Sequence, residues 1–236
     1  MISVCIATYN GQRFIGRQIT SILSQLEEGD EVIVSDDGST DETLSVINQL
    51  GDPRVRIIEG PHRHSPVWNF ENALKHAKGD FIFLSDQDDL WMLDKVEVTM
   101  HWLQKYDCVV SDCRTMNAEE RVLEDSFYAV NGTRSGKYYN LLVKNGYLGC
   151  CMAFRRNVLK ASLPFPPDIP MHDIWIGNVA AFRYSVCFIA DKLMHYRRHG
   201  DNASTASSPS AYSLSERLRF RWIVARDIHQ LKRKGL

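Results

Sequence analysis

The sequence lacks the features that would place it across a membrane, outside the cell or on a nucleic acid. It has no stretch of about eighteen consecutive apolar residues, so we expect no membrane-spanning helix. The first residues, MISVCIATYN, contain no basic leader, so we expect no secretory signal. The 28 basic and 29 acidic residues leave a formal net charge of −1, which gives no indication of nucleic-acid binding. We therefore expect a cytoplasmic protein.

The cysteines form no CxxC pair, a spacing common in zinc and redox sites. Most lie inside apolar runs such as SVCIATY and YSVCFIA, which favours buried free thiols in a reducing compartment over a zinc site or a disulfide. The adjacent Cys150 and Cys151 have no histidine near them in the sequence, so we expect them to pack in a strand rather than act as nucleophiles. The six cysteines are Cys5, Cys108, Cys113, Cys150, Cys151 and Cys187.

The first half of the chain alternates between strand and helix patterns. Short β-branched runs ended by turn residues predict strands, and apolar residues at helical spacing predict helices. This alternation is typical of a parallel, doubly wound sheet covered by helices. The expected strands are 2–8, 31–36, 55–60, 80–86 and 107–113, and the expected helices are 14–26, 40–50, 67–79 and 93–106.

The second half is less regular. Residues 114–145 are polar and mixed, and an apolar strand-like run follows at 146–156. Four prolines within 163–173 predict a rigid loop, because proline removes a backbone donor and fixes its own φ angle. A helix is expected at 173–184 and a strand with a turn at 185–199.

Polar clusters follow three of the expected strands: TYNGQ, SDDGSTD and SDQDD. In open α/β sheets, ligands bind beyond the carboxyl ends of the strands, so parallel strands would bring the three clusters to one edge. Each cluster alone has an ordinary interpretation, either a turn with a helix cap or a solvated acidic run. Together and in this order they indicate a binding site.

Five segments resemble the inverting glycosyltransferases of family 2, and look most like those that build bacterial surface polysaccharide. The resemblance spans residues 7–202, and its first three segments are the most specific in combination. It implies the GT-A fold of nucleotide-diphospho-sugar transferases, a Rossmann-like, mostly parallel sheet covered by helices with an acceptor-side extension. The segments are ATYNGQRFIGRQITSILSQ, IVSDDGSTDET, GDFIFLSDQDDLW, HDIW and YRRHGDN.

The resemblance also suggests a domain organisation. Residues 1–205 would form the transferase domain, with a nucleotide-sugar-binding half at 1–113 and an acceptor-binding half at 114–205. A Ser-rich linker and a basic amphipathic helix would make up 206–236. This helix either packs on the domain or lies on an anionic membrane and brings the site to a lipid-linked acceptor.

The acidic cluster is the expected metal site. Asp86, Asp88 and Asp89 repel one another at a strand end, and a divalent cation between them and a diphosphate would relieve that repulsion. Oxygen ligands suit Mg²⁺ or Mn²⁺. By resemblance to the family's DxD motif, Asp88 is the expected direct ligand, and Asp86 faces the ribose or helps to position the metal. Asp89 would support them, and His199 would supply a further ligand.

The other two clusters are expected to hold the nucleotide. Asp37 resembles the family carboxylate that accepts from a pyrimidine ring N–H, which uracil and thymine share. Thr8, Tyr9 and Asn10 would shape the base and ribose pocket, although a plain strand-end turn is the alternative for Tyr9 and Asn10. Arg198, together with its neighbour Arg197, could neutralise phosphate.

The expected catalytic base is Asp173. An inverting transfer needs a carboxylate that takes the proton of the acceptor hydroxyl. The family often has Glu-Asp here, whereas this chain has His172-Asp173, which leaves the role of His172 on the acceptor side open. Asp173 could instead only cap the following helix. Trp175 could form an acceptor-side wall or belong to the core.

Two other functions compete with sugar transfer. A sugar nucleotidyltransferase would usually have a Gly-rich, basic phosphate loop after the first strand, and TYNGQ has one glycine and no lysine. A non-catalytic nucleotide-sugar-binding module would be expected to have lost Asp88 or Asp173, and both are present. The donor sugar and the acceptor, a saccharide or a lipid-linked saccharide, stay open at this point.

Overall fold

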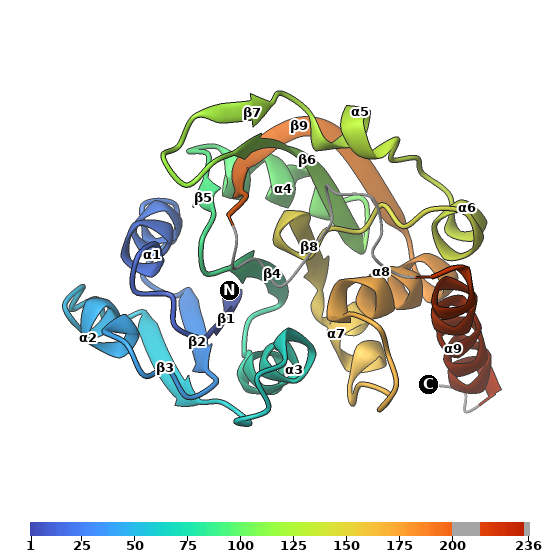
Figure 1. The fold of residues 1–236 in the computed structure, drawn as a ribbon, viewed down its shortest axis with the longest axis horizontal. Coiled ribbons are helices and arrows are strands. Elements are labelled where there is room, and N and C mark those ends of the chain that lie inside the picture. Colours follow the sequence, from blue (N-terminus) through green and yellow to red (C-terminus); the bar gives the residue numbers. More distant parts are fainter. Residues whose placement is uncertain (200–212, 234–236) are drawn as a thin grey trace.

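The computed structural model describes residues 1–199 and 213–233, in which nine strands form one curled sheet flanked by helices (Figure 1). The predicted alternation of the first half is confirmed. Its elements are β1 (Ile2–Thr8), α1 (Ile15–Leu23), β2 (Glu31–Asp36), α2 (Thr43–Asn48), β3 (Val55–Glu59), α3 (Pro66–His76), β4 (Phe81–Asp86), β5 (Leu90–Trp91), α4 (Lys95–Leu103) and β6 (Cys108–Met116).

The first four long strands form the parallel half of the sheet, in the order β3-β2-β1-β4. Their register aligns Thr8 with Asp36 and Ala7 with Asp86. The carboxyl ends of β1, β2 and β4 therefore meet at one edge, as the sequence predicted, and the three polar clusters meet with them.

The second half adds strands of both directions. After β7 (Val122–Glu124), α5 (Phe127–Asn131), α6 (Lys137–Leu142) and a short 3₁₀ turn (Gly149–Cys151), β8 (Met152–Arg155) inserts between β4 and β6, antiparallel to both. β9 (Val186–Arg197) runs parallel to β6, and β5 joins the far edge antiparallel to β9. The sheet is thus parallel across β3, β2, β1 and β4 and mixed across β8, β6, β9 and β5.

Helices cover the sheet through apolar stripes. In α1, Ile15, Ile19 and Ile22 recur at helical spacing and are fully buried. α3 packs on β1 and β2 and begins with Pro66, whose fixed φ suits the first helical position. α7 (Arg156–Ser162) and α8 (His172–Arg183) lie beside α3 in Figure 1, and α8 also contacts α6 and α9.

The predicted C-terminal helix is present as α9 (Leu214–Arg233). Its inner face is buried through Ile223, Val224 and Ile228, so it packs on the domain. The predicted linker up to residue 212 and the end of the tail, 234–236, lie outside the described residues. No helix among the described residues is long and apolar enough to cross a membrane.

The cysteines are free thiols, as expected. Five are buried and Cys187 is partly buried. Burial raises the pKa of the Cys5 and Cys108 thiols far above their usual value, so these side chains behave as small apolar groups.

Candidate active site

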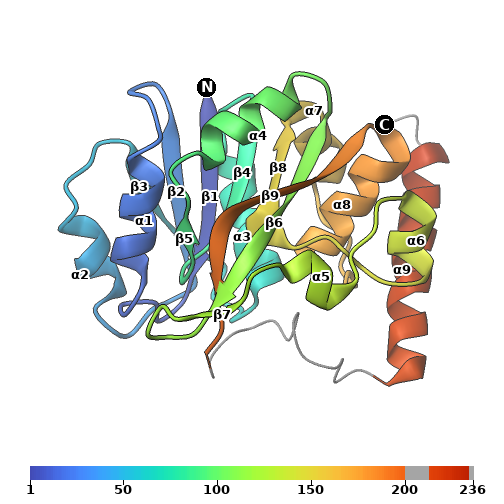
Figure 2. The ribbon, with the colours of Figure 1, turned by 90° about the horizontal axis from the view of Figure 1, so that it is seen from above.

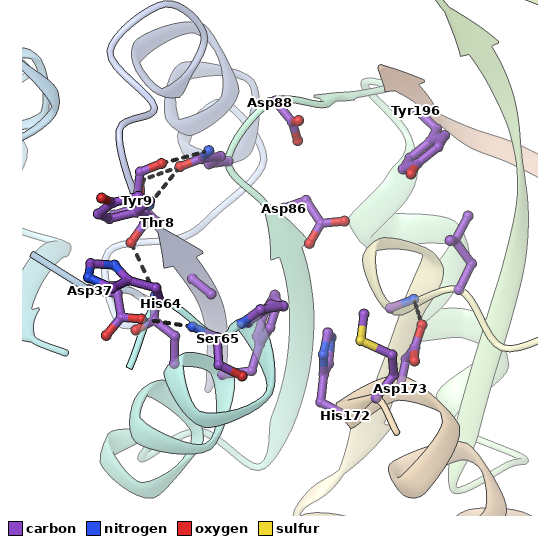
Figure 3. A pocket seen from close by; sticks show the side chains of 18 residues that line it. Thr8, Tyr9, Asp37, His64, Ser65, Asp86, Asp88, His172, Asp173 and Tyr196 are labelled. Atoms are coloured by element: carbon purple, nitrogen blue, oxygen red, sulfur yellow. Dashed lines mark hydrogen bonds between the residues drawn. The ribbon is translucent and has the colours of Figure 1, made fainter. Parts of the chain in front are cut away.

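A cavity of about 210 Å³ opens at the carboxyl edge of the parallel strands (Figure 3). Asp86 stands between its two walls in Figure 3. One wall comes from the ends of β1 and β2 and the segment before α3, and the other comes from the 3₁₀ turn, the start of α8 and the end of β9. The lining includes Thr8, Tyr9, Asp37, His64, Phe70, Asp86, Gln87, Asp88, Gly149, His172, Asp173 and Tyr196.

The wall at the end of β1 is held by hydrogen bonds to the Gln87 side chain. Gln87 accepts from the Thr8 hydroxyl at 2.6 Å and the Tyr9 amide at 3.0 Å, and it donates to the Tyr9 carbonyl at 3.2 Å. These bonds tie the end of β1 to the acidic loop after β4. Tyr9 stays 40% exposed, and the centroid of its ring lies 4.6 Å from that of the His64 ring in a T-shaped arrangement.

Asp37 lines the cavity and also has a structural role. Its two carboxylate oxygens accept from the backbone amides of Arg63 and Ser65, each at 3.1 Å. Asp37 is therefore held rigidly in the cavity wall, and each oxygen keeps a lone pair for a further donor. These bonds also place His64 in the wall, a residue that the sequence reasoning missed because its loop carries no motif.

Asn10 does not line the cavity. Its backbone has a positive φ of 50°, and its side-chain oxygen accepts from the Thr40 amide at 2.8 Å. Its amide donates to the Ser39 hydroxyl at 2.9 Å. Asn10 thus joins the loops after β1 and β2 and supports the wall from behind.

The acidic cluster is crowded and poorly solvated. Asp86 reaches the cavity but is enclosed by protein, and this burial, together with the charges of Asp88 and Asp173, raises its pKa to about 7. Burial and the neighbouring Asp88 also raise the pKa of Asp89 well above its usual value. A cation bound here would relieve both the repulsion and the desolvation.

Two sets of side chains could hold that cation. In the first set, the Asp88 carboxylate lies 2.7 Å from a ring nitrogen of His199, and Asp88 and Asp86 both line the cavity. In the second set, ligand atoms of Asp86, Asp89 and Cys150 lie within 4.8 Å of one another. The Cys150 thiol is fully buried with a pKa raised by that burial, whereas Mg²⁺ and Mn²⁺ prefer oxygen ligands. The first set contains two carboxylates and no thiol, so it fits a hard cation better.

The arginines after β9 serve different purposes. Arg197 is 1% exposed and donates to the carbonyls of Asp88 at 2.6 Å and Ala118 at 3.1 Å. It also pairs with Glu120 at 3.2 Å. Arg197 is therefore a buried residue that ties the acidic loop to the segment at 118–120. This corrects the expectation that it could reach phosphate. Arg198 is partly exposed at the end of the strand and does not line the cavity.

The opposite wall contains a second buried carboxylate. Asp173 lies in the first turn of α8 and accepts from the Gly149 amide at 3.1 Å and from the Ile174 amide at 2.7 Å. Burial outweighs these hydrogen bonds and raises its pKa to about 6. The cap residue of the helix is Met171, so Asp173 is not a simple N-cap.

His172 is buried without partners for its ring nitrogens. It is 3% exposed and stacks on Phe70 with ring centroids 4.0 Å apart. Neither nitrogen is hydrogen-bonded in the described part of the chain, and burial lowers its pKa to about 3, so the ring is neutral. A Cβ at Gly149 would lie 2.8 Å from its Nε2, so only glycine leaves room for this ring. The ring can both donate to and accept from a ligand hydroxyl.

Trp175 does not reach the cavity. It is 1% exposed and donates its indole N–H to the Ser162 carbonyl at 2.8 Å, so it belongs to the core rather than to an acceptor wall. Tyr196, by contrast, lines the cavity near Asp86 (Figure 3) and was missed, because its position follows from the pairing of β9 and not from a local motif.

Comparisons with known proteins agree with this architecture. The family model "Glycosyl transferase family 2" matches residues 3–163. The E. coli enzyme WfgD, a UDP-Glc:alpha-D-GlcNAc-diphosphoundecaprenol beta-1,3-glucosyltransferase, is 26% identical over 70% of this chain and 64% of its own length. The dTDP-rhamnosyl transferase RfbG of Shigella flexneri is 27% identical over 84% of this chain and 72% of its own length.

Solved structures show the same fold. S. aureus TarS 1-349 in complex with UDP-GlcNAc superposes with a TM-score of 0.70 at 20% identity, covering 98% of this chain and 66% of that one. The mannosyltransferase PcManGT of Pyrobaculum calidifontis, solved with GDP-Man and Mn²⁺, gives a TM-score of 0.64 at 22% identity, covering 85% and 58%. The chain therefore has the GT-A fold and belongs to glycosyl transferase family 2.

Proposed function

We propose that this chain is a metal-dependent, inverting glycosyltransferase that uses a UDP- or dTDP-sugar. Its acceptor would be a hydroxyl group of a saccharide or a lipid-linked saccharide in cell-surface polysaccharide synthesis. One observation carries the proposal: a single cavity joins the acidic pair Asp86 and Asp88 to a buried carboxylate, Asp173, on the facing wall. The relatives support the donor and acceptor classes, since WfgD is named for UDP-Glc and a diphosphoundecaprenol acceptor and RfbG for a dTDP-sugar.

In this proposal the nucleotide lies along the wall formed by β1 and β2. The exposed Tyr9 side chain stacks on the base, and Asp37 accepts from the ring N–H with its remaining lone pairs. Asp88, Asp86 and His199 are the residues that would hold Mg²⁺ or Mn²⁺, an ion that supplies positive charge to the departing diphosphate. Arg198 would approach the same phosphates from the end of β9.

Asp173 would act as the base of the transfer. The acceptor oxygen attacks the anomeric carbon, the bond from that carbon to the diphosphate oxygen breaks, and the hydroxyl proton passes to the Asp173 carboxylate. A pKa of about 6 suits this task, because the group is ionised near neutral pH and still basic enough to take a proton. The Gly149 amide fixes the direction of the carboxylate, and neutral His172 would bind a sugar hydroxyl beside it.

The decisive experiment measures donor binding and turnover with and without metal. We expect UDP- or dTDP-sugars to raise the melting temperature only in the presence of Mn²⁺ or Mg²⁺, since a ligand specific for the folded state stabilises it. Asp88→Asn should abolish this metal-dependent shift and leave the fold intact. Asp80→Asn, at a well exposed carboxylate at the other end of β4, is the matched control.

The outcomes separate the competing functions. Asp88→Asn protein that binds and turns over donor like the wild type would remove the metal assignment. Donor binding without hydrolysis or transfer to any acceptor would favour a binding module. Formation of a nucleotide sugar from a sugar phosphate and a nucleoside triphosphate would favour a nucleotidyltransferase. The proposed location is the cytoplasm, at the inner face of the membrane if the acceptor is lipid-linked.

A further inference from the structure

Exposed apolar side chains gather on two neighbouring helices. Thirteen large apolar side chains are exposed among the described residues, and six of them lie on α9, on α6 or directly after α6. The remaining seven are scattered singly or in pairs over other elements. We name the group the α6–α9 surface; its members are Tyr138, Leu142, Val143, Leu214, Leu218 and Trp222.

The two helices are fastened to each other and to the domain. Arg221 of α9 donates to the Val143 carbonyl just after α6 at 2.6 Å, and both helices contact α8. Figure 2 shows α6 beside α9 at one side of the molecule. The six side chains therefore stand on a rigid support.

The exposed apolar stripe of α9 is distinct from its buried one. Leu214, Leu218 and Trp222 are four residues apart, so they follow one another along one side of the helix. Ile223 and Val224 belong to the buried side that packs on the domain. Trp222 is 61% exposed, and the guanidinium of Arg226 lies over its ring at 5.1 Å. Packing on the domain thus leaves a second apolar side uncovered within the described structure.

Positive charge surrounds this surface. Residues 126–145 contain three basic residues and no acidic one: Arg134, Lys137 and Lys144. Residues 214–231 of α9 contain four basic residues, Arg217, Arg219, Arg221 and Arg226, against Glu216 and Asp227. Asp227 is buried and paired with Arg226 at 2.6 Å, and Glu216 accepts from Ser213 at the start of the helix. The acidic groups of α9 are thus engaged locally.

We propose that the α6–α9 surface binds the face of a lipid bilayer that contains anionic lipids. Tryptophan, tyrosine and leucine side chains flanked by arginine and lysine suit the boundary between headgroups and acyl chains. A second copy of this chain is a poorer occupant, because apposing the same surface would bring like charges together. The inference does not depend on sugar transfer, since binding to vesicles needs neither donor nor acceptor.

The surface lies close to the cavity through one helix. α8 begins with His172 and Asp173 in the cavity wall and contacts both α6 and α9. In Figure 2 the N-terminal end of α9 lies at the same side of the molecule as the carboxyl ends of the parallel strands. A bilayer bound at this surface therefore lies beside the cavity wall that the start of α8 forms.

The test is flotation of the full chain with vesicles of phosphatidylcholine alone and of phosphatidylcholine mixed with phosphatidylglycerol. We expect binding only to the mixed vesicles, and release by high salt, which screens surface charge. The double variant Leu218→Ser/Trp222→Ser should float at least tenfold less, and Leu142→Ser/Val143→Ser should also lose binding. Leu93→Ser is the matched control, because Leu93 is 85% exposed on the loop before α4.

A second pair of variants tests the charge. Arg217→Gln/Arg219→Gln should weaken binding about 30-fold, because each basic residue near an anionic surface contributes roughly fivefold. Lys105→Gln/Arg121→Gln removes two exposed charges elsewhere and should leave binding unchanged. Circular dichroism and melting temperature of each variant show that the fold is kept, and Trp222→Phe should retain binding.

Three results would overturn the proposal. The wild type could fail to float with anionic vesicles, or the Leu218/Trp222 variant could float as well as the Leu93 control. In the third, light scattering shows a dimer that Trp222→Ser converts to a monomer, and the wild type does not bind vesicles. That result would make this surface an interface between copies. None of these results bears on donor binding, so a failure here leaves the proposed function standing.

Discussion

At the scale of single residues, Asp173 gives the clearest prediction. Its pKa of about 6 is raised by burial, and the base must be ionised, so transfer should fall as the pH drops below about 6. Asp173→Asn should lower the transfer rate about 10²–10⁴-fold and leave donor affinity nearly unchanged. Calorimetry of donor binding beside the rate of transfer measures both. A loss of donor affinity equal to the loss of rate would place Asp173 in the donor site instead.

His172 leads to a prediction of opposite sign for stability and activity. A buried polar group without partners costs about 1–3 kcal/mol, which exceeds the roughly 0.5–1.5 kcal/mol of its stacking on Phe70. His172→Leu should therefore keep or raise the free energy of unfolding, measured with urea. Transfer should fall about 2–10-fold if the ring binds a sugar hydroxyl. Unchanged transfer with raised stability would show that the ring has no ligand.

At the scale of elements, the end of β9 supports the acidic loop. Arg197 connects the Asp88 carbonyl to the segment at 117–120, and its guanidinium lies over the Phe14 ring at 4.5 Å. Removing a buried, hydrogen-bonded charge leaves its partners unsatisfied, so Arg197→Met should lower the free energy of unfolding by about 3 kcal/mol. Metal affinity should weaken as the loop loses its support.

The control for this prediction is Arg13→Met. Arg13 is 64% exposed and approaches Glu119 only to 3.9 Å, so its loss should change stability by less than about 0.5 kcal/mol. Small, equal losses of unfolding free energy for Arg197→Met and Arg13→Met would show that the buried contacts of Arg197 do not stabilise the fold.

The elements also show where sequence patterns stop being informative. The strands and helices of the first half follow from local periodicity, and the meeting of their polar ends follows from parallel pairing. The insertion of β8 between β4 and β6 has no local signal, since a four-residue run does not specify its partners. Tyr196 and His64 also had no local signal. The long-range pairing of β9 places Tyr196 in the cavity wall, and the backbone hydrogen bonds to Asp37 place His64 there.

At the scale of the whole molecule, the cavity lies between two differently built parts. One wall stands on the parallel strands β1 and β2, whereas the other comes from the 3₁₀ turn, the start of α8 and the end of β9. Motifs marked the first wall well, because the turns that follow its strands are rich in Asp, Asn, Gly and Ser. The second wall was marked only by His172-Asp173, and the sequence left Trp175 open between this wall and the core because a buried and a cavity-facing indole look alike in sequence.

The insertion of β8 has a consequence for how such a molecule can evolve. β8 is the antiparallel strand between the parallel strands and the β6–β9 pair, so the two walls of the cavity stand on different parts of the sheet. Under the proposed division, substitutions beyond β8 can change the acceptor while the wall that holds the nucleotide is left untouched.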